Sequence, residues 1–177
     1  MLLNDLLKRE KDAILKKWFS LILETYASDT ATLMRKDKNQ FTNPVGSTIS
    51  REIEALFKGL LENRGFEELS TSLDALLKIR SVQDFTPSQA VGFIFLLKKA
   101  VRETLEGEIH KESVSEEGLK FFSRIDGLAL LAFDLYMDCR EKICEIRINE
   151  AKAEKEMAFR MMERMTHSKE KQPQEKD

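Results

Sequence analysis

The sequence predicts an all-α protein, a bundle of five to six helices with a long C-terminal helix that projects from it. Three observations predict this class. Seven glycines and three prolines in 177 residues are too few for a turn-rich all-β fold. Apolar residues recur at helical spacing through most of the chain. The segment 115–166 contains no proline, and one helix over its length would measure roughly 78 Å at a rise of about 1.5 Å per residue.

The N-terminal region predicts one long helix, one short helix and a loop. An amphipathic pattern over residues 4–25 indicates the first helix, with Trp18 on its apolar side. Ser28 or Asp29 is suited to cap a short helix. Residues 37–46 include the turn-forming pair Asn-Pro and a glycine, so we expect a loop there.

Two further helices are predicted on either side of a glycine. Ser47 is a suitable N-cap for the first of them, whose buried stripe is rich in Ile, Leu and Phe. Gly65 indicates its C-terminal end. The next helix, with leucines on one face, begins at Phe66 and ends near Asp84.

The clearest local motif is Thr-Pro-Ser-Gln at residues 86–89. The hydroxyl of Thr86 can accept a first-turn amide, Pro87 suits the N1 position, and Gln89 can complete a capping box, so these three residues are structural. The helix that follows is expected to reach Glu106. Its start is apolar nearly all round, which indicates a central, buried element, and Gly92 would let another helix approach closely.

The composition of the last helix predicts three regions in the chain: a bundle, an exit helix and a tail. Ser113 or Ser115 is expected to cap it, and its apolar first half completes a sensory or regulatory bundle over residues 1–140. The charged segment 141–166 is predicted to be a projecting exit helix for dimerisation or signal transmission. Residues 167–177 are polar and are predicted to form a disordered tail.

Candidate interface residues lie on this exit helix: Arg140, Arg147, Met157 and Met161. Apolar residues repeat every seven positions from Met137 to Met165, but the accompanying positions are mostly charged, so the coiled-coil heptad is poor. The pattern fits a loose parallel dimer, docking onto a partner helix, or a solvated helix.

Composition narrows the classes of function. A net charge of −2 gives no basic surface for nucleic acid. The sequence has neither a secretory signal nor an apolar run that could span a bilayer, so we expect a cytoplasmic protein without direct membrane insertion. Cys139 and Cys144 lie five residues apart on one helix and point to different faces, which disfavours a disulfide between them.

No arrangement for catalysis is predicted, and we expect neither a metal site, a cofactor nor an enzyme. The sequence contains no glycine-rich motif for binding phosphate. Its two histidines are His110 and His167. Neither has the neighbouring residues expected of a zinc ligand or of a general base for a nucleophile. His110, at the end of a helix, would be a poorly fixed haem ligand. Asp134 and Asp138 share a helix face and could bind a cation, but solvation or pairing with Arg124, Arg140 or Arg80 is the simpler interpretation.

Three blocks of sequence resemble the N-terminal domain of RsbRD-type proteins, the RsbT co-antagonists of bacterial stress signalling. They are NPVGSTI (43–49), SVQDFTPSQAVGFIFLLKKAVRE (81–103) and DGLALLAFDLYMDCREKICEIRINEAK (126–152). The likeness extends from KKWFSLILETY (16–26) to about residue 155. The resemblance implies a dimeric sensory domain, a haem-free globin-like bundle as in related stressosome proteins, and a kinase or STAS-type partner. No STAS domain follows here, so a stand-alone or shortened member is expected.

Three functions remain open at this point. The leading hypothesis is a non-enzymatic signalling domain that senses a ligand or partner and relays the change through its C-terminal helix. The second is a helical adaptor that docks onto a larger enzyme complex. The third is a small-ligand-binding or haem-binding globin-like protein, in which aromatic residues would line a pocket.

Overall fold

A computed structural model describes residues 3–36, 41–83, 85–106 and 116–170, with residues 36 and 168–170 described by their backbone alone. The described residues form α-helices and short connections, and no strand occurs among them. The predicted all-α class is therefore confirmed. The chain divides into two units, Met1–Cys139 and Arg140–Asp177, which are described separately below.

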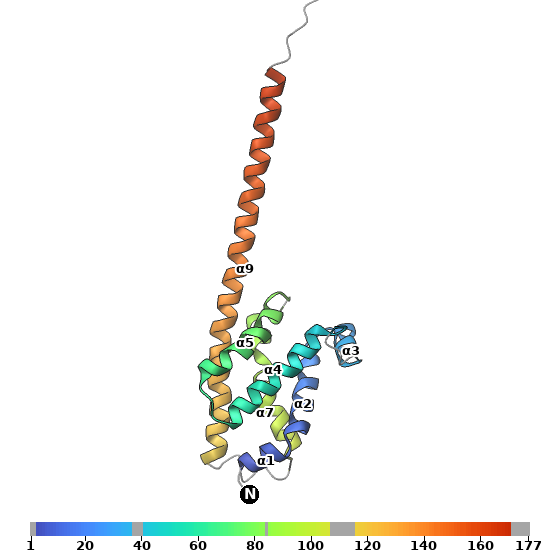
Figure 1. Ribbon diagram of the computed structural model, residues 1–177, viewed down its shortest axis with the longest axis vertical. Helices are drawn as coiled ribbons and strands as arrows, with labels where there is room; N and C mark the ends of the chain where they lie inside the picture. The colour runs from blue at the N-terminus through green and yellow to red at the C-terminus, as the bar shows by residue number, and fades with distance from the viewer. Residues whose placement is uncertain (1–2, 37–40, 84, 107–115, 171–177) are drawn as a thin grey trace, which may run out of the picture. The chain divides into compact units, whose positions relative to one another are not determined.

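The helices follow one another along the chain as shown in Figure 1. Their bounds are α1 Leu3–Arg9, α2 Lys11–Leu23, α3 Ser28–Lys36, α4 Pro44–Leu61, α5 Phe66–Ser81, α6 Pro87–Gly92, α7 Phe95–Thr104 and α9 Glu116–Glu170.

The first predicted helix is divided into α1 and α2 at Glu10, whose backbone departs from helical geometry. The division lets both segments bury apolar residues in the same core. Leu3 and Leu7 are buried on α1, and Ile14 and Trp18 are buried on α2.

Helix α4 begins at Pro44, earlier than the predicted start after Ser47. The cap is Asn43, whose Oδ1 accepts a hydrogen bond from Gly46 N at 2.9 Å. Pro44 occupies the first turn, where its missing N–H has no cost. The Nδ2 of Asn43 also donates to Met34 O at 2.8 Å, so this one buried side chain connects the end of α3 to the start of α4.

The end of α4 corrects the prediction that Gly65 stops this helix. Asn63 adopts the left-handed conformation, with φ 55°. The N–H of Asn63 reaches Leu60 O at 3.3 Å and the N–H of Arg64 reaches Gly59 O at 2.9 Å, the bond pattern of a Schellman cap. Gly65 has a negative φ and is the N-cap of α5. Helix α5 ends at Ser81, and the predicted endpoint Asp84 lies outside the described residues.

The core of the first unit is made by amphipathic helices that pack in pairs. Helix α2 packs against α4 and α7, and α4 packs against α5. The first half of α9 adds Ile125, Leu128 and Ala132, all fully buried. The largest fully buried side chains are Trp18, Tyr136, Phe57 and Phe93.

Gly92 is not a point of close helix approach, contrary to the prediction, because a Cβ built there meets nothing within 4 Å. The close approach occurs at Gly127 on α9, where a Cβ would lie 2.7 Å from Cζ of Phe66. A side chain at position 127 would therefore displace the Phe66 ring at the start of α5.

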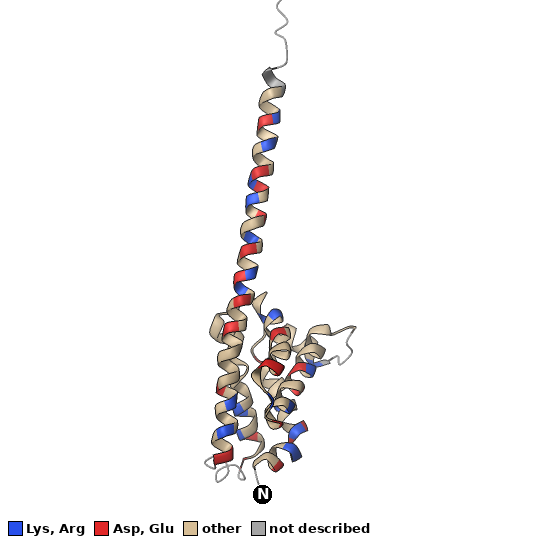
Figure 2. Cartoon of the chain, turned by 60° about the vertical axis from the view of Figure 1, so that its left-hand side comes forward, with Lys and Arg blue, Asp and Glu red and all other residues tan. Residues whose placement is uncertain are grey.

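The second unit consists, in its described part, of the C-terminal part of α9. Its side chains are exposed from Cys144 to His167, with acidic and basic residues interspersed along the helix (Figure 2). Because α9 extends to Glu170, the first residues of the predicted tail 167–177 are helical, and 171–177 lie outside the described residues. The predicted caps Ser113 and Ser115, and His110, also lie outside them. None of the described helices combines the length and the apolar character needed to cross a bilayer.

Candidate functional site

The helix predicted over residues 87–106 is interrupted between α6 and α7. There the N–H groups of Ile94 and Leu97 bond to the carbonyls three residues back, on Val91 and Ile94. The carbonyls of Ala90 and Phe93 consequently lose the partners that a continuous α-helix would give them.

Side chains from two other helices take over these carbonyls. The Nε of Arg80, on α5, donates to Ala90 O at 2.9 Å. The Nε1 of Trp18, on α2, donates to Phe93 O at 2.8 Å. Two bonds from other helices thus stabilise the interruption, and for this reason the local sequence pattern predicts one continuous helix.

Arg80 is only 2% exposed, and its guanidinium lies among aromatic rings. Its Cζ lies 4.2 Å from the ring centroid of Phe85, 5.2 Å from that of Tyr26 and 5.4 Å from that of Phe93. Its Nη2 donates to Gln89 O at 3.0 Å and to Thr25 Oγ1 at 3.2 Å. We call Arg80 and these three rings the Arg80 centre.

No carboxylate pairs with Arg80 among the residues that the structure describes. Burial lowers the pKa of its guanidinium, and burial likewise raises the pKa of the Tyr26 phenol. The positive charge is stabilised by carbonyls at the C-terminal end of α6 and by the negative faces of the rings. Arg80 Nη1, Tyr26 Oη and Gln83 Oε1 are buried together, and the side chains of Arg80 and Gln83 act on the Tyr26 phenol in the opposite sense to burial, lowering its pKa.

Helix α9 is connected to this centre through Tyr136, which is fully buried. Its hydroxyl donates to Phe85 O at 3.4 Å, and the Phe85 ring packs edge-to-face against Tyr26 at 5.4 Å. Helices α2, α5, α6 and the first half of α9 thus all contribute to one buried polar centre in the first unit.

Replacing Trp18 by Phe tests the hydrogen bond to Phe93 O while most of the apolar bulk is kept. We expect the free energy of unfolding to fall by about 1–3 kcal/mol, because a buried carbonyl loses its donor and a small void forms. Urea denaturation followed by circular dichroism measures this difference. Equal midpoints for the two proteins would show that this bond does not hold the interruption.

The three predicted capping residues lie at the start of α6. Gln89 N donates to Thr86 Oγ1 at 3.3 Å, and Thr86 N donates to Gln89 Oε1 at 3.0 Å. Pro87 is the first helical residue, so the capping box is complete. This cap fixes the start of the segment whose other end Arg80 holds.

Thr86→Ala is expected to lower the free energy of unfolding by about 1 kcal/mol, because the first-turn amide loses its acceptor. Thr86→Ser keeps the hydroxyl and is the matched control. Thermal melts of the two variants give the comparison, and an alanine variant as stable as the serine variant would contradict the assignment.

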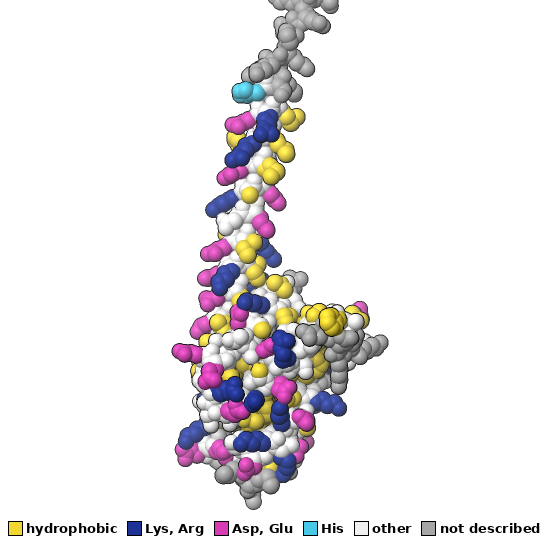
Figure 3. Space-filling model, in the orientation of Figure 1, with side chains coloured by type: hydrophobic (Ala, Val, Ile, Leu, Met, Phe, Trp, Pro, Cys, Tyr) yellow, Lys and Arg dark blue, Asp and Glu magenta, His cyan; other side chains and the backbone are white. Residues whose placement is uncertain are grey.

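A second feature is an apolar face on the second unit. Positions 144, 148, 151, 155, 159 and 162 advance by four, three, four, four and three residues, an 11-residue pattern that keeps one face of a helix. Apart from Lys155 they are apolar: Cys144, Ile148, Ala151, Phe159 and Met162. Ile148 is 53% exposed, Phe159 63% and Met162 67%. Hydrophobic side chains gather along one edge of this segment in Figure 3. We call these five residues the apolar face.

The predicted interface residues lie beside this face. At about 100° per residue, Arg140 and Arg147 flank it, and Met161 and Met157 lie progressively farther round the same side. Arg140 is half-buried and the other three are exposed. Their role in an interface stays a prediction. The seven-residue template missed the apolar face because its period is closer to 11 residues in three turns.

The other candidate groups are not brought together. Asp134 and Asp138 are exposed. Of their suggested partners, Arg124 donates to Arg64 O at 2.5 Å and Arg80 bonds to carbonyls. Among the described residues no group of three or more His, Cys, Asp or Glu could hold a metal ion. Cys139 is buried with its Sγ 4.0 Å from Asp74 Oδ1, whereas Cys144 is exposed, so the two sulfurs face different surroundings.

The fold is that of an all-α protein. The first part of its last helix, α9, belongs to the packed first unit, and the part from Arg140 onward belongs to the second unit. More particularly, the chain belongs to the RsbT co-antagonist protein rsbRD N-terminal domain family, whose model matches residues 12–150. This confirms the family that the sequence blocks resemble. The family is one of regulatory signalling domains.

One relative is an uncharacterized protein of Archaeoglobus fulgidus. It is 29% identical over 102 residues, which cover 57% of this chain and 64% of the relative. No solved structure matches the chain. The globin-like arrangement implied by the family resemblance therefore stays a prediction.

Proposed function

We propose that this protein is a non-enzymatic signalling domain that senses a ligand or partner and relays the change through α9. The observation that carries the proposal is the make-up of α9. One 55-residue helix contains the buried residues Ile125, Leu128 and Tyr136 and, farther along, the exposed apolar face. Membership in a family of stressosome-type signalling domains supports the same function, with a cytoplasmic location.

The proposed mechanism is a shift between two packings of the first unit. The Arg80 centre is suited to this role because it joins several helices through a buried charge with no carboxylate partner in the described structure. A different arrangement of its hydrogen bonds would displace Phe85 and therefore Tyr136 on α9. A ligand or partner that binds one packing more tightly would then change the population of the two states.

The proposed output is self-association through the apolar face. An isolated helix is marginally stable in water, so burial of this face would stabilise the C-terminal part of α9. In a parallel homodimer each apolar position meets its equivalent, and an 11-residue repeat gives a right-handed supercoil. A kinase or a STAS-type protein is the further partner that the family suggests.

A second candidate is a helical adaptor that docks α9 into a groove of a larger complex. Methionines at four exposed positions near the end of α9 favour it, because Met adapts to varied helix-binding surfaces. They are Met157, Met161, Met162 and Met165.

Sedimentation velocity on the purified protein, alone and in cell extract, separates the two functions. A homodimer that forms from the isolated chain supports the signalling domain. A protein that is monomeric alone and sediments with another protein at fixed stoichiometry supports the adaptor and contradicts our proposal of self-association.

A further inference from the structure

A pocket of about 760 Å³ lies between α2, α3 and α4, in the first unit. Its volume falls within the range of small-molecule sites, roughly 300–1,000 Å³. It does not overlap the capping box or the apolar face, and the family match assigns it no role.

Each of the three helices contributes an apolar side chain to the pocket. Leu15 and Phe19 come from α2, Met34 from α3 and Ile53 from α4. Met34 and Ile53 are buried, and Leu15 and Phe19 are half-buried. The lining can therefore cover an apolar body and remove it from water.

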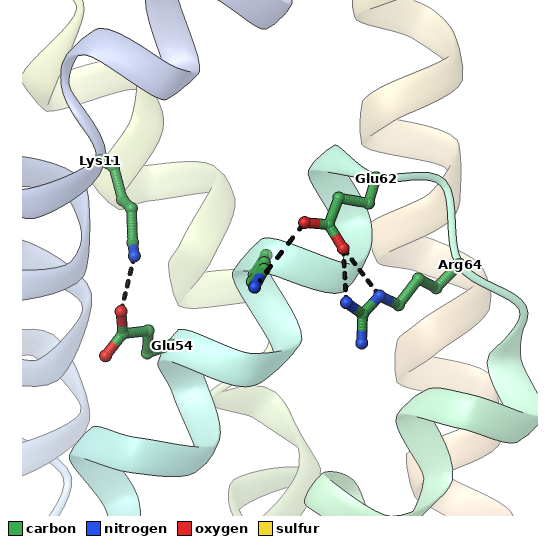
Figure 4. A network of polar contacts seen from close by, with 5 residues as sticks. Lys11, Glu54, Glu62 and Arg64 are labelled. Carbon is green, nitrogen blue, oxygen red and sulfur yellow. Dashed lines mark hydrogen bonds and ion pairs between the residues drawn. The ribbon is translucent and has the colours of Figure 1, made fainter.

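Each of the same helices also contributes a cation: Lys16 from α2, Arg35 from α3 and Arg51 from α4. The one carboxylate of the lining is Glu54, and Lys11 already binds it, with Nζ 2.6 Å from Oε1 (Figure 4). The pocket consequently carries an excess of positive charge.

Two of these cations have no carboxylate partner within the described part of the chain. Arg51 is held by Glu52, with Nη2 2.8 Å from Oε1. Lys16 and Arg35 form no ion pair with any residue that the structure describes. They come from two helices, α2 and α3, and line the same pocket.

The wall between α3 and α4 is fixed before any ligand binds. Asn43, which lines the pocket, donates to Met34 O at 2.8 Å and accepts from Gly46 N at 2.9 Å. A preformed wall lowers the cost of ordering the site on binding.

We propose that this pocket binds a small organic anion with an apolar body, such as a medium-chain carboxylate. The carboxylate pairs with Lys16 and Arg35, and the alkyl chain lies over Leu15 and Phe19, the two half-buried apolar residues of the lining. The inference rests on the proposed function in one respect, since the bound anion would be the sensed signal. Binding itself is independent of α9.

The test is isothermal titration of the full chain with decanoate at millimolar concentration. Decanol, which lacks the charge, and acetate, which lacks the apolar body, are the matched probes. Decanoate is expected to bind measurably and the other two at least tenfold more weakly, because the site needs both parts of the ligand. Undetectable decanoate binding, or equal affinity for decanol, would overturn the proposal.

Substitutions in the pocket lining test whether decanoate binds at this site. Ser50 lines the pocket and is exposed, so Ser50→Trp fills the space without disturbing the core and should abolish binding. Lys16→Ala and Arg35→Ala should each weaken decanoate roughly two- to fivefold, the range of exposed ion pairs. Arg160→Ala, on the second unit, is the charge-matched control and should change nothing. Unaltered binding to Ser50→Trp would place the ligand elsewhere and reject the site.

Light scattering with and without decanoate separates this inference from the proposed relay. A saturable titration that Ser50→Trp removes supports the pocket, whatever the assembly state. A protein that binds decanoate in this way and keeps the same assembly state retains the pocket and counts against decanoate as the relayed signal.

Discussion

Arg80→Ala is expected to lower the free energy of unfolding by about 2–4 kcal/mol, the largest stability effect that we predict for one side chain. The substitution removes the donor that holds Ala90 O and Gln89 O at the end of α6. It also leaves a void among the rings of Tyr26, Phe85 and Phe93. Removing Arg80 leaves no unpaired carboxylate behind and also removes the cost of burying its charge. The expected loss of stability is therefore smaller than for a broken buried ion pair.

Two variants on α5 accompany this measurement by urea denaturation. Arg80→Lys keeps the charge but cannot reproduce the forked contacts of a guanidinium, so its stability should be intermediate. Lys78→Ala removes an exposed cation paired with Asp74 and should leave the midpoint unchanged. If Arg80→Ala were as stable as the wild type, the Arg80 centre would not determine the packing of α6.

The double substitution Ile148→Glu and Phe159→Glu is expected to weaken self-association by about 10⁴-fold or more, because a homodimer loses four apolar side chains from its interface. Each large apolar side chain that leaves an interface costs about 1.5–3 kcal/mol, and each tenfold in affinity corresponds to about 1.4 kcal/mol. Both residues belong to the apolar face and are more than half exposed in the described structure. Analytical ultracentrifugation over a range of concentrations measures the dissociation constant.

The control is Ile146→Glu, which introduces one of the same two negative charges, but on the opposite side of α9. Ile146 is 57% exposed, much like Ile148, so helix stability and solubility change in the same way. Association of the control should equal that of the wild type. An equal loss in both variants would mean that charge alone, and not the apolar face, controls assembly.

Local chemistry made part of the fold predictable. The cap formed by Thr86 and Gln89 involves residues three apart, so the sequence contains all of it. Asn43 and Pro44 form a similar start for α4, but Ser47 is also a suitable N-cap, so the sequence alone does not distinguish the two starts. The end of α4 is ambiguous in the same way, because both Asn and Gly tolerate the left-handed conformation of a C-terminal cap. In the structure Asn63 adopts this conformation, and Gly65 begins α5.

Long-range contacts determined what the sequence did not predict. The interruption between α6 and α7 depends on Arg80 and on Trp18, which lies 75 residues from its acceptor Phe93. The pocket likewise requires α2 beside α3 and α4, and no local pattern places Lys16 near Arg35. The apolar face could have been predicted, because its 11-residue spacing is present in the sequence. A seven-residue repeat does not match that spacing and therefore does not predict the face.

We propose that the C-terminal part of α9 assembles the protein, and light scattering on the full chain and on a version ending at Arg140 decides whether it does. Both are measured over a series of concentrations, with circular dichroism to verify that the shortened protein keeps its folded core. We predict a dimer for the full chain and a monomer for the shortened one. A dimer that persists after the truncation would place the interface on the first unit and contradict the claim.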